Sequence, residues 1–239
     1  MIMQNDIIAH VESEGACEAC GVVINDNVYM PCRNIAADPL NFFDIHPDDY
    51  IDAERRGEIT AIVHSHPGGL PHLSTGDRRA QLETGLDWWV VCDGAIHKYR
   101  PVSPLLGRQF EHGVFDCYTL FRDAYHLAGV DLDDFGRWPD WWESGRELYL
   151  ENMYAQGFYQ VDEPQAGDMI LICLGSARAN HSAIYTGDQY ILHHCPNRLS
   201  KRDLYNGFWL KHTHSLWRHK QWLSSGWAGI SADLEKITN

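Results

Sequence analysis

Two histidines one residue apart, His64 and His66, stand at the end of an apolar segment and are followed by Pro67 and two glycines. In an extended segment alternate side chains point to the same face, so both imidazoles can reach one metal ion. Asp77, at the start of the next expected helix, can add a carboxylate. Two nitrogens, one oxygen and an open water position are typical of a catalytic zinc site, where the ion lowers the pKa of the water to about 7.

Such a site also needs a carboxylate that handles the proton and a hydroxyl that stabilises the oxyanion. Glu18 directly precedes an expected strand, and Ser74 precedes Asp77 by three residues. Ser74 is a candidate for the hydroxyl, and Glu18 is one of the carboxylates near this strand that could be the base. Glu12 and Glu14 are alternatives for the base, although solvated surface carboxylates are their ordinary interpretation.

The full spacing is H-x-H-P-x6-S-x2-D, with "EACGVV" upstream. This set resembles the JAMM metalloprotease family of the MPN+ type, over roughly residues 1–100. The resemblance implies Zn²⁺ as the cofactor, and it implies a role for each matching residue. Glu18 would be the general acid/base, Ser74 would assist the tetrahedral intermediate, and the zinc ligands would be His64, His66 and Asp77.

A second set of reactive residues lies further along the chain. Cys117 follows Asp116 at the expected start of a helix, where the dipole and the free N–H groups favour a thiolate. His181 begins an expected strand and His193 lies on the next, so a hairpin would bring the two imidazoles together. This is the arrangement of a nucleophile, a base and a residue that orients the base. His194 is the alternative for the third role, because only one of two adjacent strand residues faces inward.

The segments "DCYTLFRDAY", "PQAGDMILI" and "HSAIYTGDQYILHH" resemble the NlpC-type cysteine peptidases, over about residues 105–200. These enzymes have a papain-like α+β core and cleave the peptide stems of bacterial cell walls. The resemblance implies Cys117 as the nucleophile, His181 as the base and His193 as the orienting residue. Two features depart from the family: Tyr118 and Thr119 replace the usual Ser-Gly after the nucleophile, and Phe110 replaces an upstream aromatic hydroxyl.

The other cysteines and one further histidine have simpler interpretations. Cys17 and Cys20 form a single C-x2-C pair, which cannot supply four thiolates, and Cys20 is expected to be buried in a strand. His72 falls between the proposed ligands and is interpreted as a surface histidine. The remaining cysteines are interpreted as structural: Cys32, Cys92, Cys173 and Cys195.

The elements that must position the first site alternate between helices and strands. Helices are expected over residues 5–15, 46–57 and 74–85, and strands over 20–32 (two, with a turn), 59–65, 87–92 and 95–101. In the second half a linker over 102–113 precedes a helix at 116–129 and strands at 167–174, 181–187 and 189–195. The sequence therefore predicts an α/β, cytidine-deaminase-like domain over 1–103 and a papain-like α+β domain over 104–239.

Composition limits the partners. The 239 residues carry a formal net charge of −14, which argues against nucleic-acid binding, and contain no apolar run long enough to predict a membrane span. The N-terminus lacks the pattern of a secretory signal, so a cytoplasmic site of synthesis is expected. Seven cysteines without small-scaffold spacing favour free thiols.

The order of the two domains, together with "GRQFEHGVFDCYTLFRDAY", resembles the protein K family of tail-tip assembly proteins of lambda-like phages. The resemblance implies other tail-tip proteins and peptidoglycan peptides as partners, in the host bacterial cytoplasm during assembly and at the virion tail tip. It implies two peptidase sites, one zinc-dependent and one of Cys-His-His type. A mainly structural assembly factor with vestigial sites is the alternative. A ubiquitin-type isopeptidase would fit the JAMM motif alone, but the NlpC-type partner argues against it.

Overall fold

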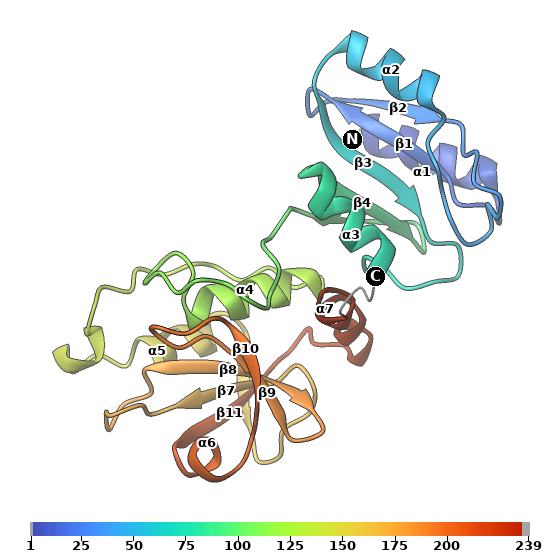
Figure 1. Cartoon of the computed structure of the whole chain (residues 1–239). Coiled ribbons are helices and arrows are strands. Elements are labelled where there is room, and N and C mark those ends of the chain that lie inside the picture. Colours follow the sequence, from blue (N-terminus) through green and yellow to red (C-terminus); the bar gives the residue numbers. More distant parts are fainter. Residues whose placement is uncertain (1, 236–239) are drawn as a thin grey trace. The chain divides into compact units, whose positions relative to one another are not determined.

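The computed structural model describes residues 2–235, which divide into two compact units with the boundary between Val102 and Ser103 (Figure 1). Each unit has its own sheet and its own core. Within the described part of the chain, no helix combines the length and apolar character that crossing a bilayer requires.

The sheet of the first unit has the order β2 (Val28–Cys32), β1 (Cys20–Ile24), β3 (Ile59–Ser65), β4 (Asp87–Cys92), β5 (Ala95–Tyr99). Strands β3 and β4 are parallel, and the other neighbours are antiparallel. The two hairpins turn where residues adopt positive φ, at Asn25–Asp26 and at Asp93–Gly94, as short primed turns require. The parallel pair needs a crossover, which contains helix α3 (Thr75–Thr84).

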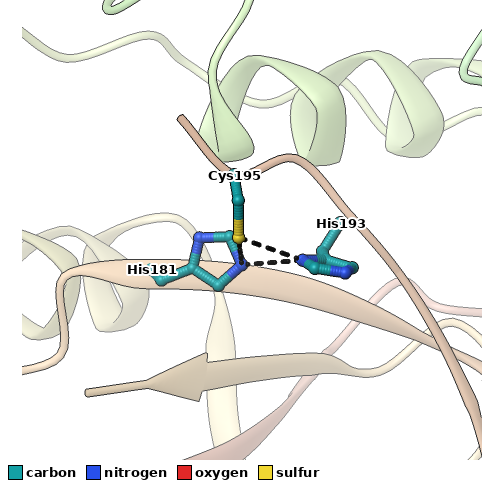
Figure 2. Close-up of side chains that lie close together, drawn as sticks. All are labelled: His181, His193 and Cys195. Atoms are coloured by element: carbon teal, nitrogen blue, oxygen red, sulfur yellow. Dashed lines mark hydrogen bonds between the residues drawn. The ribbon is translucent and has the colours of Figure 1, made fainter. Parts of the chain in front are cut away.

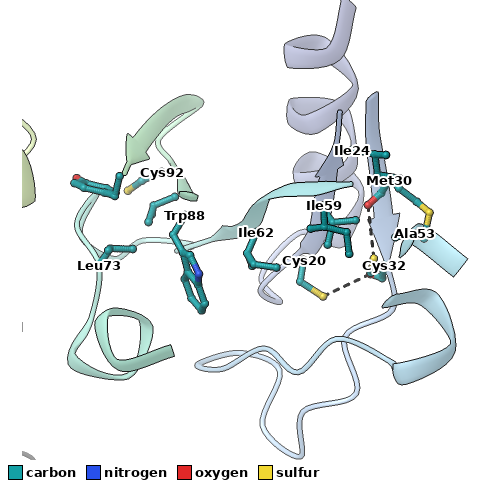
Figure 3. Close-up of a cluster of buried hydrophobic side chains, with 13 residues drawn as sticks. Cys20, Ile24, Met30, Cys32, Ala53, Ile59, Ile62, Leu73, Trp88 and Cys92 are labelled. Atoms are coloured by element: carbon teal, nitrogen blue, oxygen red, sulfur yellow. Dashed lines mark hydrogen bonds between the residues drawn. The ribbon is translucent and has the colours of Figure 1, made fainter. Parts of the chain in front are cut away.

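Helices cover both faces of this sheet. Helix α1 (Ile2–Glu14) places Ile7 in a cluster with alternate residues of the central strands, among them Val63 and Val91. On the opposite face, helices α2 (Pro47–Arg56) and α3 pack on a second cluster, part of which Figure 3 shows around Ile62 and Trp88. Alternation along the strands therefore divides the apolar residues between two layers of helices.

The second unit has a six-stranded sheet in the order β10-β9-β8-β7-β11-β6, with every neighbouring pair antiparallel. The strands predicted from sequence are β7 (Met169–Ile172), β8 (His181–Gly187) and β9 (Tyr190–His193). The sequence did not predict β6 (Phe158–Val161), β10 (Lys201–Leu204) or β11 (Thr213–His219). These three are short or partly exposed, so their hydrophobic alternation is weak.

Helix α4 (Cys117–Leu127) packs on this sheet through a largely buried surface and also contacts α7 (Trp227–Leu234). The other short elements are 3₁₀ helices at Trp141–Ser144 and Ser224–Gly226 and helices α5 (Leu148–Ala155) and α6 (Gly207–Lys211).

Of the segment 102–113, predicted as a linker, residues 103–113 instead belong to the second unit. Leu105 is fully buried, and the Arg108 guanidinium donates to Asp123 at 2.8 Å. Pairing of a buried cation with a buried carboxylate holds the segment beside α4, because an unpaired buried charge would be costly.

Candidate functional site

His64 and His66 lie at the end of β3, and their Nε2 atoms are 2.9 Å apart. Oδ2 of Asp77 is 3.3 Å from each of these nitrogens. In tetrahedral zinc coordination, two donor atoms at about 2.0–2.1 Å from the ion are about 3.3 Å from each other. The separations and the donor types therefore fit a zinc ion held by His64, His66 and Asp77.

The local fold sets the orientation of these ligands. His66 Nδ1 is 2.7 Å from the carbonyl oxygen of Leu70, which places the ring proton there and leaves the Nε2 lone pair for a metal. Asp77 stands in the first turn of α3, where its Oδ2 accepts the backbone N–H of Ser74 at 2.8 Å. Burial alone would raise the pKa of Asp77, but the two adjacent imidazoles hold it well below its usual range.

Glu18, Ser74, His66 and Asp77 line one pocket of about 900 Å³. Glu18 is only 8% exposed, and burial raises the pKa of its carboxyl to about 7. A carboxyl with a pKa near neutrality can both accept and return a proton. Much of the remaining wall is apolar, with side chains from α2, from β3 and β4 and from the segment before α2: Phe42, Phe43, Tyr50, Ile51, Ile62 and Trp88.

Ser74 caps helix α3 as well as facing the pocket. Its Oγ accepts the backbone N–H of Asp77 at 3.1 Å, which completes a reciprocal capping box. We expect Ser74→Ala to lower the free energy of unfolding by about 1 kcal/mol, because the cap is lost. Urea denaturation with a chelator present measures this, and Ser74→Thr, which keeps the hydroxyl, is the control. Equal stability of Ser74→Ala and the native chain would contradict the capping role.

The other residues considered near this site differ in how far they are buried. Glu12 and Glu14 are exposed on α1, as expected for surface carboxylates, and Cys20 is fully buried, as predicted. The prediction of His72 as a surface residue is wrong. His72 is only 7% exposed, and its Nδ1 lies 3.1 Å from the hydroxyl of Tyr99.

In the second unit, Cys117 is the first residue of α4, and Asp116 is its N-cap. The Asp116 carboxylate accepts from the N–H of Thr119 at 2.9 Å and from the buried Arg137 guanidinium at 2.9 Å. Cys117 and His181 line the same pocket of about 250 Å³, together with Asp116 and Arg137. The structure thus brings the expected nucleophile and base to one pocket.

The environment of the thiol differs from the expectation at a helix N-terminus. Burial raises the pKa of Cys117, and the neighbouring Asp116 carboxylate raises it further. Hydrogen bonds act in the opposite direction: the Tyr149 hydroxyl is 3.1 Å from Sγ, and Ser182 also contributes. Burial and Asp116 therefore act against the thiolate that a helix N-terminus favours, so a base is needed to form it.

His181 and His193 meet across the β8–β9 hairpin. His193 is paired with Ala183, two residues from His181, so the two histidines share a face of the sheet. His181 Nε2 is 3.2 Å from His193 Nδ1 (Figure 2), and His193 Nε2 is 3.1 Å from Asp203 Oδ2. The ring of His194 lies instead against Phe110. Of the two alternatives for the third position, His193 is the one that contacts His181.

Three residues near this site were not among the sequence-based candidates. Phe110 has no hydroxyl, but the hydroxyl of Tyr149 lies 3.1 Å from Cys117 Sγ. Tyr149 belongs to α5, a helix in which no sequence motif indicates such a role. Asp203 reaches His193 from β10, a strand that the sequence did not predict. Cys195, interpreted as structural, lies 3.5 Å from His193 Nδ1. Its spacing H-x-C from His193 was the available signal.

Comparison with known proteins matches both units to families. Residues 2–103 match the model for prokaryotic homologs of the JAB domain, and residues 107–218 match the NlpC/P60 family. The tail tip assembly protein K of Escherichia phage lambda is 57% identical over 190 residues, covering 79% of this chain and 96% of that protein. The protein of the same name from Escherichia phage N15 is 35% identical, covering 90% and 93%.

Among solved structures, this chain is similar to an NLP/P60-family protein of Staphylococcus aureus that is described as similar to a lipoprotein. The match covers 47% of this chain and 36% of the chain of that protein. Its identity is 21% and its TM-score is 0.34.

The chain therefore joins a JAB domain to an NlpC/P60 domain, and the predicted fold class, α/β followed by α+β, is confirmed. It belongs to the tail tip assembly protein K family.

Proposed function

We propose that the second unit hydrolyses amide bonds in peptidoglycan peptides through Cys117, during tail assembly or entry into the host. The observation that carries the proposal is that Cys117 and His181 line one pocket while His181 is hydrogen-bonded to His193. The pocket of about 250 Å³ is smaller than most ligand sites, so it can hold only the part of a peptide next to the bond that is cleaved. NlpC/P60 membership and the tail-tip relatives support the choice of bacterial wall peptides.

The residues can divide the reaction as follows. His181 accepts the thiol proton of Cys117, and Sγ bonds to the carbonyl carbon of the peptide. The C–N bond then breaks, the amine takes the proton from His181, and a thioester remains. Water hydrolyses the thioester and regenerates the thiol. His193, kept neutral because burial lowers its pKa, accepts the Nε2 proton of His181 in a hydrogen bond and so orients the base.

We propose a second peptidase site in the first unit, with zinc held by His64, His66 and Asp77. A bound zinc ion would polarise the peptide carbonyl and lower the pKa of a water molecule. Glu18, which lines the same pocket as the ligands His66 and Asp77, would move the proton from that water to the leaving amine. The Ser74 hydroxyl faces the same pocket and would stabilise the oxyanion.

The setting proposed for both sites is the host cytoplasm during assembly and the virion tail tip, with other tail-tip proteins as partners. The names of the two phage relatives support this setting. In that setting the cysteine site would meet wall peptides, and the metal site could act on a tail protein.

Incubation of the purified full chain with bacterial peptidoglycan tests the cysteine site. We expect the native chain to release peptides that mass spectrometry identifies, and Cys117→Ala to release none above background. Cys173→Ala is the control, since Cys173 is a free cysteine that lies outside the pocket. Identical products from the native chain and Cys117→Ala would overturn the proposal.

A further inference from the structure

Cys195 lies beside the two histidines of the cysteine site (Figure 2). Its Sγ is 3.9 Å from His181 Nε2 and 3.5 Å from His193 Nδ1, and these two nitrogens are 3.2 Å apart. The three donor atoms thus form a small triangle at the end of the β8–β9 hairpin. The peptidase role of His181 needs only Cys117 and His193, and it leaves this thiol unexplained.

The triangle has the dimensions of a tetrahedral zinc site. With zinc–nitrogen bonds of about 2.0–2.1 Å and a zinc–sulfur bond of about 2.3 Å, the nitrogens stand about 3.3 Å apart and each is about 3.6 Å from the sulfur. The observed separations are 3.2, 3.5 and 3.9 Å. A metal ion therefore fits with shifts of a few tenths of an ångström.

The surroundings also match a metal site. His193 Nε2 lies 3.1 Å from Asp203 Oδ2, so the ring proton sits on Nε2 and the Nδ1 lone pair faces the triangle. His181 and His193 are almost fully buried, and the ring of Trp209 packs against His193 with 4.4 Å between centroids. Cys195 is only partly buried, which leaves a side from which an ion can enter.

We propose that His181, His193 and Cys195 form a second, transition-metal site of the zinc class, and that metal bound there reversibly silences the cysteine site. The proposal of metal binding depends only on the positions of the three donor atoms. The silencing rests on the proposed function, in which His181 accepts a proton from Cys117.

The silencing follows from the single proton of a neutral imidazole. With the His193 proton on Nε2, its Nδ1 can accept Nε2–H of His181 across 3.2 Å, and the Nδ1 lone pair of His181 is then left for the Cys117 thiol in the pocket that both residues line. When Nε2 coordinates a metal, the ring proton must stand on Nδ1, which can then accept nothing. Cys195 loses its thiol proton to solvent on binding, because the thiolate is the ligand. His193 keeps its bond to Asp203 in both states.

Titration of the full chain with Co²⁺ tests the binding. A thiolate ligand gives a sulfur-to-cobalt charge-transfer band in the near ultraviolet, which the sulfur-free set of His64, His66 and Asp77 cannot give. We expect the band in the native chain and in the controls Cys117→Ser and Cys173→Ser, and its loss in Cys195→Ser. Absence of the band from the native chain, or its persistence in Cys195→Ser, would overturn the site.

Alkylation of Cys117 by iodoacetamide, followed at its own peptide by mass spectrometry, tests the silencing without a substrate. We expect Zn²⁺ to slow this alkylation about tenfold or more in the native chain, and to leave the rate in Cys195→Ser unchanged, since loss of base assistance costs at least that much. If the cobalt band appears but Zn²⁺ does not slow the alkylation of Cys117, the metal site stands and the inhibition of the cysteine site is refuted. Failure of the peptidoglycan assay would refute the proposed function and leave the cobalt result intact.

Discussion

If the first unit binds zinc as proposed, replacing His64 by alanine is expected to remove most of that zinc. His64 is almost fully buried and supplies one of three donor atoms that lie about 3 Å apart. Losing an outer partner of a metal ligand already lowers affinity about 10–100-fold. Losing the ligand itself is expected to cost more, so the ion should dissociate during dialysis.

Zinc content per chain, measured by elemental analysis, gives the result. The measurement is made in a Cys195→Ser background, so that the cluster in the second unit cannot add an ion. His72→Ala is the matched control, because His72 is also buried in the first unit but pairs with Tyr99. Equal zinc content in His64→Ala and His72→Ala would rule out the proposed ligand set.

Replacing His181 by alanine is expected to lower kcat/KM for peptide cleavage by about 10²–10⁴-fold, the usual contribution of a positioned general base. Burial and Asp116 raise the pKa of Cys117, so its thiol stays protonated at neutral pH unless a neighbour accepts the proton. The Tyr149 hydroxyl can stabilise the thiolate once formed but cannot take that proton, because its own pKa is well above the usual value.

His194→Ala provides the comparison, because His194 is also buried and follows His193 directly in the chain, but its ring packs on Phe110. Initial rates of peptide release over a range of substrate concentrations separate kcat from KM, and circular dichroism checks the fold of each variant. If His181→Ala and His194→Ala lose activity equally, the base is not His181.

Local signals in the sequence predicted most of the elements of the first unit. The turn residues at Asn25–Asp26 and Asp93–Gly94 delimit the hairpins, and the Ser74 cap fixes where α3 begins. Because a strand end and the following helix start are close along the chain, H-x-H and the cap together predict the neighbouring ligands. His72 was the error: its loop folds inward against Tyr99, and a loop's path is not encoded in a short pattern.

The second unit was less predictable because its contacts come from distant segments. Tyr149 reaches Cys117 across 32 residues, and Asp203 reaches His193 from a strand with weak alternation. The choice between His193 and His194 depends on strand register, since a shift of one residue exchanges the two faces. The thiol pKa depends on burial, which no local motif reports.

By itself, the sequence determined the types of donor and nucleophile and their order along the chain, because covalent spacing fixes which groups share a strand end or a helix start. Only the tertiary structure decided which of them meet. Cys117 and His181 line one pocket, and His193 is the histidine that contacts His181. Cys195 and Asp203 also lie within contact distance of His193. Those contacts arise from strand pairing and burial, which depend on the whole core rather than on neighbouring residues.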